Sequence, residues 1–178
     1  MGNTRSHMML LLVLTATLMI QNCICQVQRG VCVLQVARNS SISVQGTLVL
    51  NQNSVQGTVR GLEANKNYAM YVHEFGDLRL GGSKIGGHFT VKADAIHSTD
   101  MNNQNRHIGD MGQITANQQG TANVNRNNMP WQLQGTNSII GRAIVIHSEP
   151  DANDPPNSPL AFCVVGIQRT EAVNVAIV

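Results

Sequence analysis

A histidine and an aspartate lie three residues apart in the stretch RHIGDMG (residues 106–112), where Gly109 and Gly112 frame the aspartate. Imidazole nitrogen and carboxylate oxygen are both common ligands of zinc. A turn that only had to be tight would need the glycines but neither His107 nor Asp110. The stretch therefore suggests a chemical role, and the positions of the other histidines indicate what that role is.

The chain has six histidines, and only His7 lies in the N-terminal segment that we expect to be removed. Any one of the others, taken singly, is more often an ordinary surface or core residue than a metal ligand. Three histidines and an aspartate can nevertheless form a closed tetrahedral site, and imidazole is a preferred ligand of both zinc and copper. Together with Asp110, the remaining histidines predict a metal site; they are His73, His88, His97, His107 and His147.

The beginning of the chain has the layout of a secretory signal. Arg5 precedes an apolar run from Met8 to Ile20, and a short polar stretch with small residues follows that run. Cys23 and Cys25 fit the −3 and −1 positions of a cleavage site that precedes Gln26. The alternative, a transmembrane anchor, would need about 20 apolar residues. The pattern therefore favours a signal peptide.

We expect residues 1–25 to be removed and residues 26–178 to form one secreted domain with no membrane-spanning segment. The chain has 12 basic and 10 acidic residues, so the domain is close to neutral. No basic run and no interleaving of basic with aromatic residues indicates a nucleic-acid partner. Asn39-Ser40-Ser41 is an acceptor triplet for N-glycosylation, which secretion would make usable.

The secreted part of the chain has the pattern of many short strands. Segments rich in β-branched residues, or alternating apolar with polar residues, are separated by Gly, Asn and Pro. No long stretch keeps a helical period, so we expect little helix. The pattern predicts an all-β, antiparallel sandwich or barrel of eight strands; the strand segments are 31–37, 43–50, 54–62, 67–75, 112–117, 120–125, 141–147 and 161–168.

Two local patterns predict how these strands pair. The segments 112–117 and 120–125 bracket Gln118-Gln119, which is the spacing of a β-hairpin. The tetrapeptide VQGT occurs at 44–47 and at 55–58, and we interpret the two copies as paired strands rather than as an internal repeat.

Two long connections interrupt the strands: a Gly-rich one at 76–109 and a Pro-rich one at 148–160. Long loops in a compact β domain are usually functional. The first of them contains His88, His97 and His107, so we expect the chemistry to lie there.

The ordered sequence blocks of the chain resemble those of copper/zinc superoxide dismutases. The resemblance covers nearly all of residues 31–168, and it implies the eight-stranded Greek-key barrel of that family, its metal ions, superoxide as substrate and a homodimer. The blocks are VCVLQ (31–35), YVHEFGD (71–77), GGHF (86–89), RHIGDMG (106–112), IIGRAIVIH (139–147) and CVVGI (163–167).

The resemblance implies a complete zinc site. The family's four zinc ligands would be His88, His97, His107 and Asp110, and the loop around His97 departs most from the family's usual sequence. Asp151 falls where the family has an aspartate that links the zinc and copper ligands, although an ordinary charged loop residue is nearly as good an interpretation.

The implied copper site is incomplete. His73, His88 and His147 match three of the family's four copper ligands, but the fourth position, the first of an H-x-H pair, is Tyr71. A phenol has a pKa near 10 and is a poor substitute for imidazole unless it is deprotonated. We therefore expect copper to be bound weakly or not at all.

The parts of the family that guide superoxide are also altered. Leu160 stands in place of the arginine that attracts and positions the anion. The connection at 148–160 is shorter than in the family and carries Glu149, Asp151 and Asp154 but no lysine or arginine. A negative approach would repel an anion.

Two cysteines, Cys32 and Cys163, remain after removal of the signal. The family's usual partner of Cys163 is replaced here by Gly82. The two thiols could be free and buried, or they could form a bridge if the first and last strands pair as the implied fold requires.

Three functional hypotheses follow. The chain is an impaired relative that keeps zinc, an active secreted superoxide dismutase, or a β domain whose histidines hold no metal. The changes at Tyr71 and Leu160 favour the first, because function depends on the site rather than on the fold.

Overall fold

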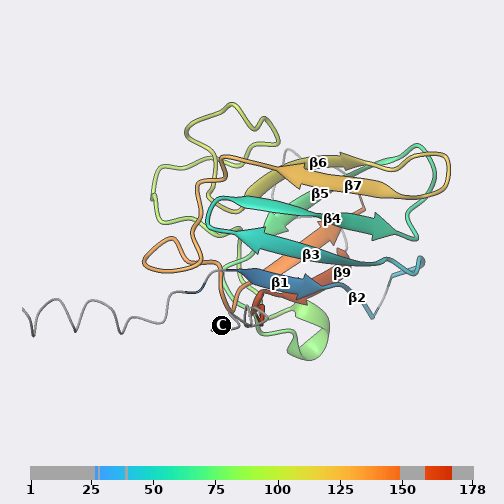
Figure 1. Cartoon of the computed structure of the whole chain (residues 1–178), viewed down its shortest axis with the longest axis horizontal. Coiled ribbons are helices and arrows are strands. Elements are labelled where there is room, and N and C mark those ends of the chain that lie inside the picture. The colour runs from blue at the N-terminus through green and yellow to red at the C-terminus, as the bar shows by residue number, and fades with distance from the viewer. Residues whose placement is uncertain (1–26, 28, 39, 149–158, 170–178) are drawn as a thin grey trace, which may run out of the picture.

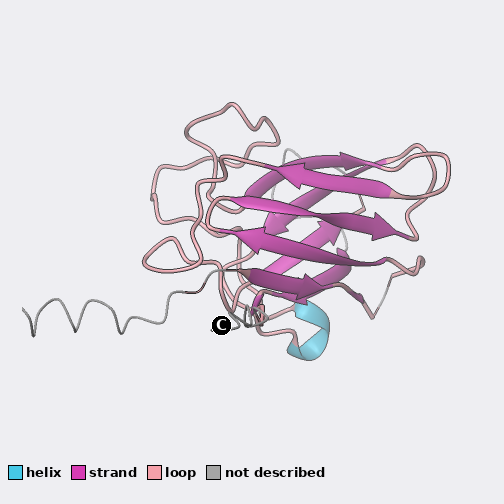
Figure 2. Ribbon diagram, viewed as in Figure 1, coloured by secondary structure: helices cyan, strands magenta, loops and turns pink. Residues whose placement is uncertain are grey.

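The computed structural model describes residues 27, 29–38, 40–148 and 159–169. In these residues the chain forms two antiparallel sheets that face each other, and the only helical element is the 3₁₀ turn η1 (Arg79–Gly82). Figure 2 shows this arrangement of strands, loops and one short turn. The expected all-β sandwich with little helix is confirmed.

The two sheets have five strands each. The first has the order β10 (Gly166–Ile167), β1 (Gly30–Val33), β3 (Gln45–Asn51), β4 (Ser54–Arg60) and β7 (Ala122–Arg126). The second has the order β2 (Gln35–Val36), β9 (Pro159–Val164), β8 (Ala143–His147), β5 (Asn67–Val72) and β6 (Asp110–Thr115).

Two of the expected strands are each divided between the sheets. The segment 31–37 breaks at Leu34, so that β1 pairs in the first sheet and β2 in the second. The segment 161–168 breaks at Val165 in the same way, giving β9 and β10. Both breaks lie where the sheets meet, which explains why ten strands are present where eight segments were expected.

The expected hairpin at 112–117 and 120–125 is wrong. β6 pairs with β5 and β7 pairs with β4, so these neighbours in sequence belong to different sheets. The side chain of Asn117 accepts hydrogen bonds from the backbone of Gln119 and Thr121, and this turns the chain across from one sheet to the other. The expected pairing of the two VQGT copies is confirmed, because Thr47 is the register partner of Thr58 in the β3–β4 pair.

Alternation of side chains places two apolar layers on the second sheet. Ile144 and Ile146 of β8 face the core between the sheets, which also contains Leu48 and the fully buried Trp131. Ala143 and Val145 face the opposite side, where they pack with Phe162, Ile85 and Leu78. The long connection after β5 thus covers the outer face of this sheet.

The long loops gather at one end of the sandwich. In Figure 1 the later, yellow-green part of the connection between β5 and β6 and the loop between β7 and β8 extend to the left of the strands, whereas the helical turn η1 lies below them. The loop between β7 and β8, residues 127–142, was not singled out in the sequence, and it contains Trp131. A disulfide joins Cys32 in β1 to Cys163 in β9, with their Cα atoms 5.4 Å apart, and so ties the two sheets together.

Candidate metal centre

One tyrosine and three histidines have their side chains on the outer face of the second sheet. Tyr68, Met70 and Val72 of β5 lie in the core, so the alternating residues Tyr71 and His73 face the other way. In the neighbouring strand His147 is the register partner of Ala69, on the same side as Tyr71 and His73. The loop returns His88 to this face through an isolated bridge between His73 and His88.

Four side chains of the loop and of β6 converge next to this face. The ligand atoms of His88, His97, His107 and Asp110 all lie within 4.8 Å of one another. Oδ1 of Asp110 is 3.3 Å from Nδ1 of both His88 and His97 and 3.7 Å from Nδ1 of His107. The structure therefore brings together the four residues that the sequence suggested as one ligand set.

The backbone of the RHIGDMG stretch holds two of these side chains in place. The backbone N–H of His107 donates to Ile96, and that of Asp110 donates to His107 itself. Gly109 packs so closely that a Cβ there would lie 2.2 Å from the carbonyl oxygen of Val72. Gly112 has a φ of +74°, a left-handed conformation that favours glycine. The glycines are thus needed for the close contact and the turn that aim His107 and Asp110 inward.

The spacing of the four ligand atoms fits a tetrahedral metal ion. Zinc bonds to nitrogen and oxygen of about 2.0–2.1 Å place neighbouring ligands of a tetrahedron about 3.3 Å apart. The separation of the two Nδ1 atoms of His88 and His97 is 3.1 Å, and the Asp110 distances are similar. Nδ1 of His107 and Oδ1 of Asp110 are buried and make no hydrogen bond within the described part of the chain. Such atoms are expected where a cation supplies the missing partner.

Asp110 is fully buried and is held in its charged form. Its other oxygen, Oδ2, accepts a hydrogen bond from the backbone N–H of Ser98 at 2.9 Å. Burial alone would raise the pKa of Asp110, but His88, the Ser98 N–H and His97 outweigh it and hold the pKa below its usual range. A charged carboxylate among three imidazoles is the donor set that binds a divalent cation.

A second group of histidines lies beside the first. Nε2 of His73 is 3.5 Å from Nε2 of His147, and Nε2 of His88 is buried without a hydrogen bond to any described residue. Nδ1 of His73 is 2.9 Å from the carbonyl oxygen of Gly86, which requires the proton on Nδ1 and leaves Nε2 with its lone pair. Burial, reinforced by His88 and His147, lowers the pKa of His73 to about 4 despite the Gly86 contact, so this imidazole is neutral at pH 7.

Comparison with known proteins identifies the family. The profile of the copper/zinc superoxide dismutase family matches residues 44–163. The chain is 38% identical over 128 residues to "Superoxide dismutase [Cu-Zn] 2" of Brassica juncea, an alignment that covers 69% of this chain and 80% of the relative. It is 32% identical over 122 residues to "Extracellular superoxide dismutase [Cu-Zn]" of Brugia pahangi, which covers 66% of this chain and 60% of that relative.

The chain belongs to the copper/zinc superoxide dismutase family. The sequence resemblance led us to expect metal ligands in both groups of histidines. The His/Asp group is complete and could hold a metal ion. The group of His73, His88 and His147 is the one for which we expected Tyr71 at the fourth position.

Tyr71 packs against the histidines that it accompanies. Its ring is stacked on that of His88, with centroids 4.0 Å apart and an interplanar angle of 20°. Its hydroxyl lies 3.4 Å from Nε2 of His97, in the His/Asp group. Tyr71 is only 1% exposed. The phenol therefore fills space at the second group while its oxygen contacts a residue of the first.

Leu160, which we expected from the resemblance to replace the anion-guiding arginine of the family, lies in β9 and is buried in the main core. It offers no charge to an approaching anion. Gly82, which the resemblance places at a cysteine position of the family, lies in η1 with a φ of +88° near the ring of Phe162, and Cys163 is bonded to Cys32. The two sheets are thus linked directly rather than through the long loop.

Several sequence-based predictions lie outside the described residues. These are the signal peptide at 1–25, the glycosylation site at Asn39, the aspartate Asp151 and the charged approach formed by Glu149, Asp151 and Asp154. In the part of the chain that is described, no helix is long and apolar enough to cross a membrane.

The sequence could not show the backbone groups that orient the ligands. The N–H of Ser98 and the carbonyl of Gly86 contact Asp110 and His73, and backbone groups leave no signal in residue type. The contact between the Tyr71 hydroxyl and His97 was missed for a related reason. The substitution at Tyr71 is visible in the sequence, but the direction of its hydroxyl is not.

Proposed function

We propose that this chain is a secreted, zinc-binding member of the superoxide dismutase family whose copper site is incomplete and whose dismutase activity is weak or absent. The observation that carries the proposal is the position of Tyr71. It occupies a copper-ligand position of the family, and its ring is stacked on His88 while its hydroxyl contacts His97.

His88, His97, His107 and Asp110 would hold zinc. Three neutral imidazoles and one carboxylate complete a tetrahedral site, which leaves no open position for a reacting molecule. Three of the four come from the long connection between β5 and β6, so zinc would pin that connection to the end of β6. We infer that this site contributes to folding rather than to chemistry.

His73, His88 and His147 would be the ligands available to copper, which in this family supplies the redox change of the reaction. The short separation of the His73 and His147 Nε2 atoms and the unpartnered Nε2 of His88 support some affinity. With Tyr71 in the fourth position, the copper ligands would differ from those of the family in number and in donor type. This would change both the affinity for copper and its reduction potential. Leu160 adds no positive charge to attract or orient superoxide.

Secretion is supported by two observations. The first residues have the composition of a signal peptide that would be cleaved before Gln26, leaving 26–178 as the mature domain. The Cys32–Cys163 disulfide suits an oxidising compartment. Glycosylation of Asn39 would follow from the same route. Detection of the mature N-terminus at Gln26 in culture medium, by sequencing of the secreted protein, tests this part.

A homodimer, as in the family, is supported by apolar side chains on the surface. Phe75, Val164 and Ile167 are 57%, 37% and 62% exposed. Gly76 lies next to Val164, so the loop after β5 and the strand β9 form one surface there. Sedimentation velocity on the secreted protein tests the proposal, and a single monomeric species at micromolar concentration would contradict it.

The alternative function is an active extracellular superoxide dismutase. The convergence of His73, His88 and His147 favours it, because three imidazoles can bind copper. The deciding experiment measures bound zinc and copper on the purified protein together with dismutase turnover. Zinc near one equivalent with little copper and little turnover supports the impaired relative, and stoichiometric copper with fast turnover supports the enzyme.

A further inference from the structure

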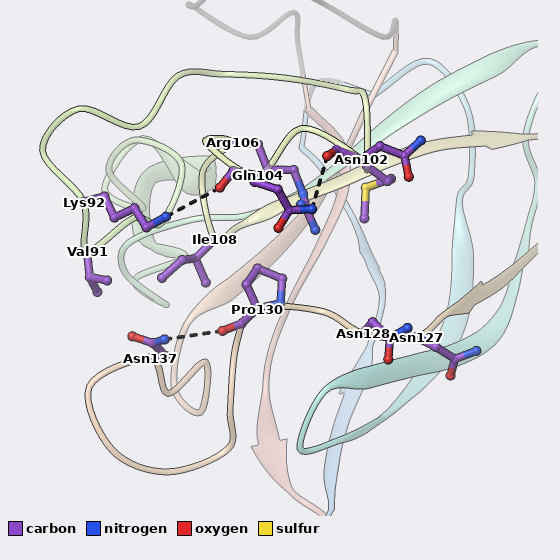
Figure 3. Close-up of a pocket in the computed structure, with 11 residues that line it drawn as sticks. Val91, Lys92, Asn102, Gln104, Arg106, Ile108, Asn127, Asn128, Pro130 and Asn137 are labelled. Atoms are coloured by element: carbon purple, nitrogen blue, oxygen red, sulfur yellow. Dashed lines mark hydrogen bonds between the residues drawn. The ribbon is translucent and has the colours of Figure 1, made fainter.

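A cavity of about 520 Å³ lies beside the metal centre. One wall is the part of the long loop between Val91 and Ile108, and the other is the connection after β7, between Asn127 and Asn137. Figure 3 shows Arg106 and Gln104 above this space and Pro130 and Asn137 below it. None of His88, His97, His107 and Asp110 lines the cavity, so it is a separate site.

The walls of this cavity combine positive charge with amide groups. Lys92 and Arg106 are its two cations, and no aspartate or glutamate is among its lining residues. Lys92 Nζ is 3.5 Å from the carbonyl oxygen of Gln104, which keeps it at the rim. The amide side chains Asn102, Gln104, Asn127, Asn128 and Asn137 supply both donors and acceptors.

Arg106 is a buried cation without a counter-ion. Arg106 is 9% exposed, and no ion pair between described residues includes it. Nη1 donates to the carbonyl oxygen of Asn103 at 3.1 Å, whereas Nε is shielded from solvent and donates to no described residue. Buried charges are normally paired, because desolvation of an unpaired one is costly. The guanidinium therefore lacks the negative partner that its burial calls for.

We propose that this cavity binds a small ligand that carries an oxyanion on a hydroxylated scaffold, such as the sulfate or phosphate ester of a sugar. The oxyanion compensates Arg106, with Lys92 at the rim, since a guanidinium is well suited to oxyanions of this kind. The amides hydrogen-bond the hydroxyl groups. The volume suits a monosaccharide ester, because small-molecule sites begin at about 300 Å³.

The position of Arg106 connects this site to the metal loop. Arg106 directly precedes His107, and the backbone pairs there with Ile96. A ligand that engages Arg106 thus contacts the turn that carries His107 and Asp110. The proposed ligand site does not depend on which metal the neighbouring residues hold. An experiment that contradicts it would therefore leave the proposed function unaffected.

Isothermal titration of the purified protein with glucose 6-sulfate, glucose 6-phosphate, inorganic sulfate and glucose tests the proposal. At least one ester should bind more tightly than sulfate, and glucose should not bind detectably. Tighter binding of one of the two esters shows whether the preferred oxyanion is a sulfate or a phosphate. Absence of binding by both esters at millimolar concentration overturns the proposal, as does equal binding of glucose. Binding of inorganic sulfate as tight as that of the tighter-binding ester means an adventitious ion only, and it overturns the proposed ligand class.

Arg106→Gln should weaken binding of the ester at least about tenfold, since it removes a charge-assisted contact. The matched control is Arg38→Gln, because Arg38 is exposed and does not line this cavity. Equal weakening by both variants would show a general charge effect and overturn the site.

A second variant tests the site without removing Arg106. Asn128 lines the cavity with a φ of +57°, a conformation that aspartate tolerates about as well as asparagine. Asn128→Asp places a negative charge in the wall and should weaken ester binding at least tenfold while the protein stays folded. Unchanged ester binding in folded Asn128→Asp overturns the proposal even if Arg106→Gln cannot be purified.

Discussion

The hydroxyl of Tyr71 lies 3.4 Å from Nε2 of His97, so the residue that we propose at a copper-ligand position contacts a residue of the neighbouring His/Asp group. Nδ1 of the same imidazole faces Asp110 and His88. A contact on the far nitrogen of a ligating histidine orients the ring and fixes its tautomer. Tyr71 can therefore serve the zinc site that we propose while leaving the copper site incomplete.

Tyr71→Phe should weaken zinc binding about tenfold, because it removes the hydroxyl and keeps the stacked ring. The affinity is measured by competition with a chromophoric chelator. The melting temperature should fall when zinc is present and should change little after chelation. Tyr68→Phe is the matched control: the Tyr68 hydroxyl accepts a hydrogen bond from Glu63 instead and is not part of the metal group. Equal zinc affinity of Tyr71→Phe and wild type would show that the hydroxyl contact has no role.

Tyr71→His should raise copper affinity more than it raises activity. The change completes a set of four imidazoles with His73, His88 and His147, but Leu160 still provides no charge for superoxide. Copper affinity is measured by competition and turnover by a superoxide assay. If Tyr71→His alone restored turnover typical of the family, the importance assigned to position 160 would be wrong.

Removal of metal should loosen the long connection between β5 and β6. Oδ1 of Asp110 and Nδ1 of His107 are buried atoms that would lose their partner when zinc leaves, and Oδ1 would then be faced only by imidazoles. Chelation should lower the melting temperature and increase protease cutting between residues 76 and 109. Asp110→Asn should reproduce both changes without chelator. A protein that chelator leaves unchanged in both assays does not hold zinc there.

Replacement of both Cys32 and Cys163 by serine should destabilise the protein by about 4–5 kcal/mol, because the bridge spans a separation of 131 residues. The free energy of unfolding is measured in guanidinium chloride. Reductant should lower the stability of the wild type to that of the double variant and leave the variant unchanged. If reductant has no effect on the wild type, the cysteines are free thiols in solution.

The fold could be predicted from the sequence because its strands alternate clearly and its blocks resemble one family. The predictions failed where tertiary contacts decide. Gln118-Gln119 has the spacing of a hairpin, yet the Asn117 side chain turns the chain between sheets. The pattern of segment 31–37 predicts one strand, but its two halves enter different sheets on either side of Leu34.

The ligand set was accessible from the sequence for a different reason. Histidine is an uncommon residue, so three of them in one loop limit the chemistry, and the resemblance implied a role for each one together with Asp110. The cavity beside Arg106 was not accessible in this way. Its walls come from residues far apart in the chain, such as Lys92 and Asn128, and their types are ordinary for loops. Only the missing counter-ion of Arg106 marks the site, and this depends on the folded structure.

The wild-type protein should dismutate superoxide slowly or not at all, even with copper supplied. In the function that we propose, Tyr71 changes the copper ligands and Leu160 replaces the group that positions the anion. A positive field around the active site can raise association rates about 10- to 1,000-fold, and Leu160 contributes none of it. Any residual turnover should also depend little on salt, since Leu160 supplies no attraction that salt could screen. The measurement is turnover against ionic strength with zinc and copper both loaded. Rates near the diffusion limit that fall steeply with salt would instead establish the active enzyme.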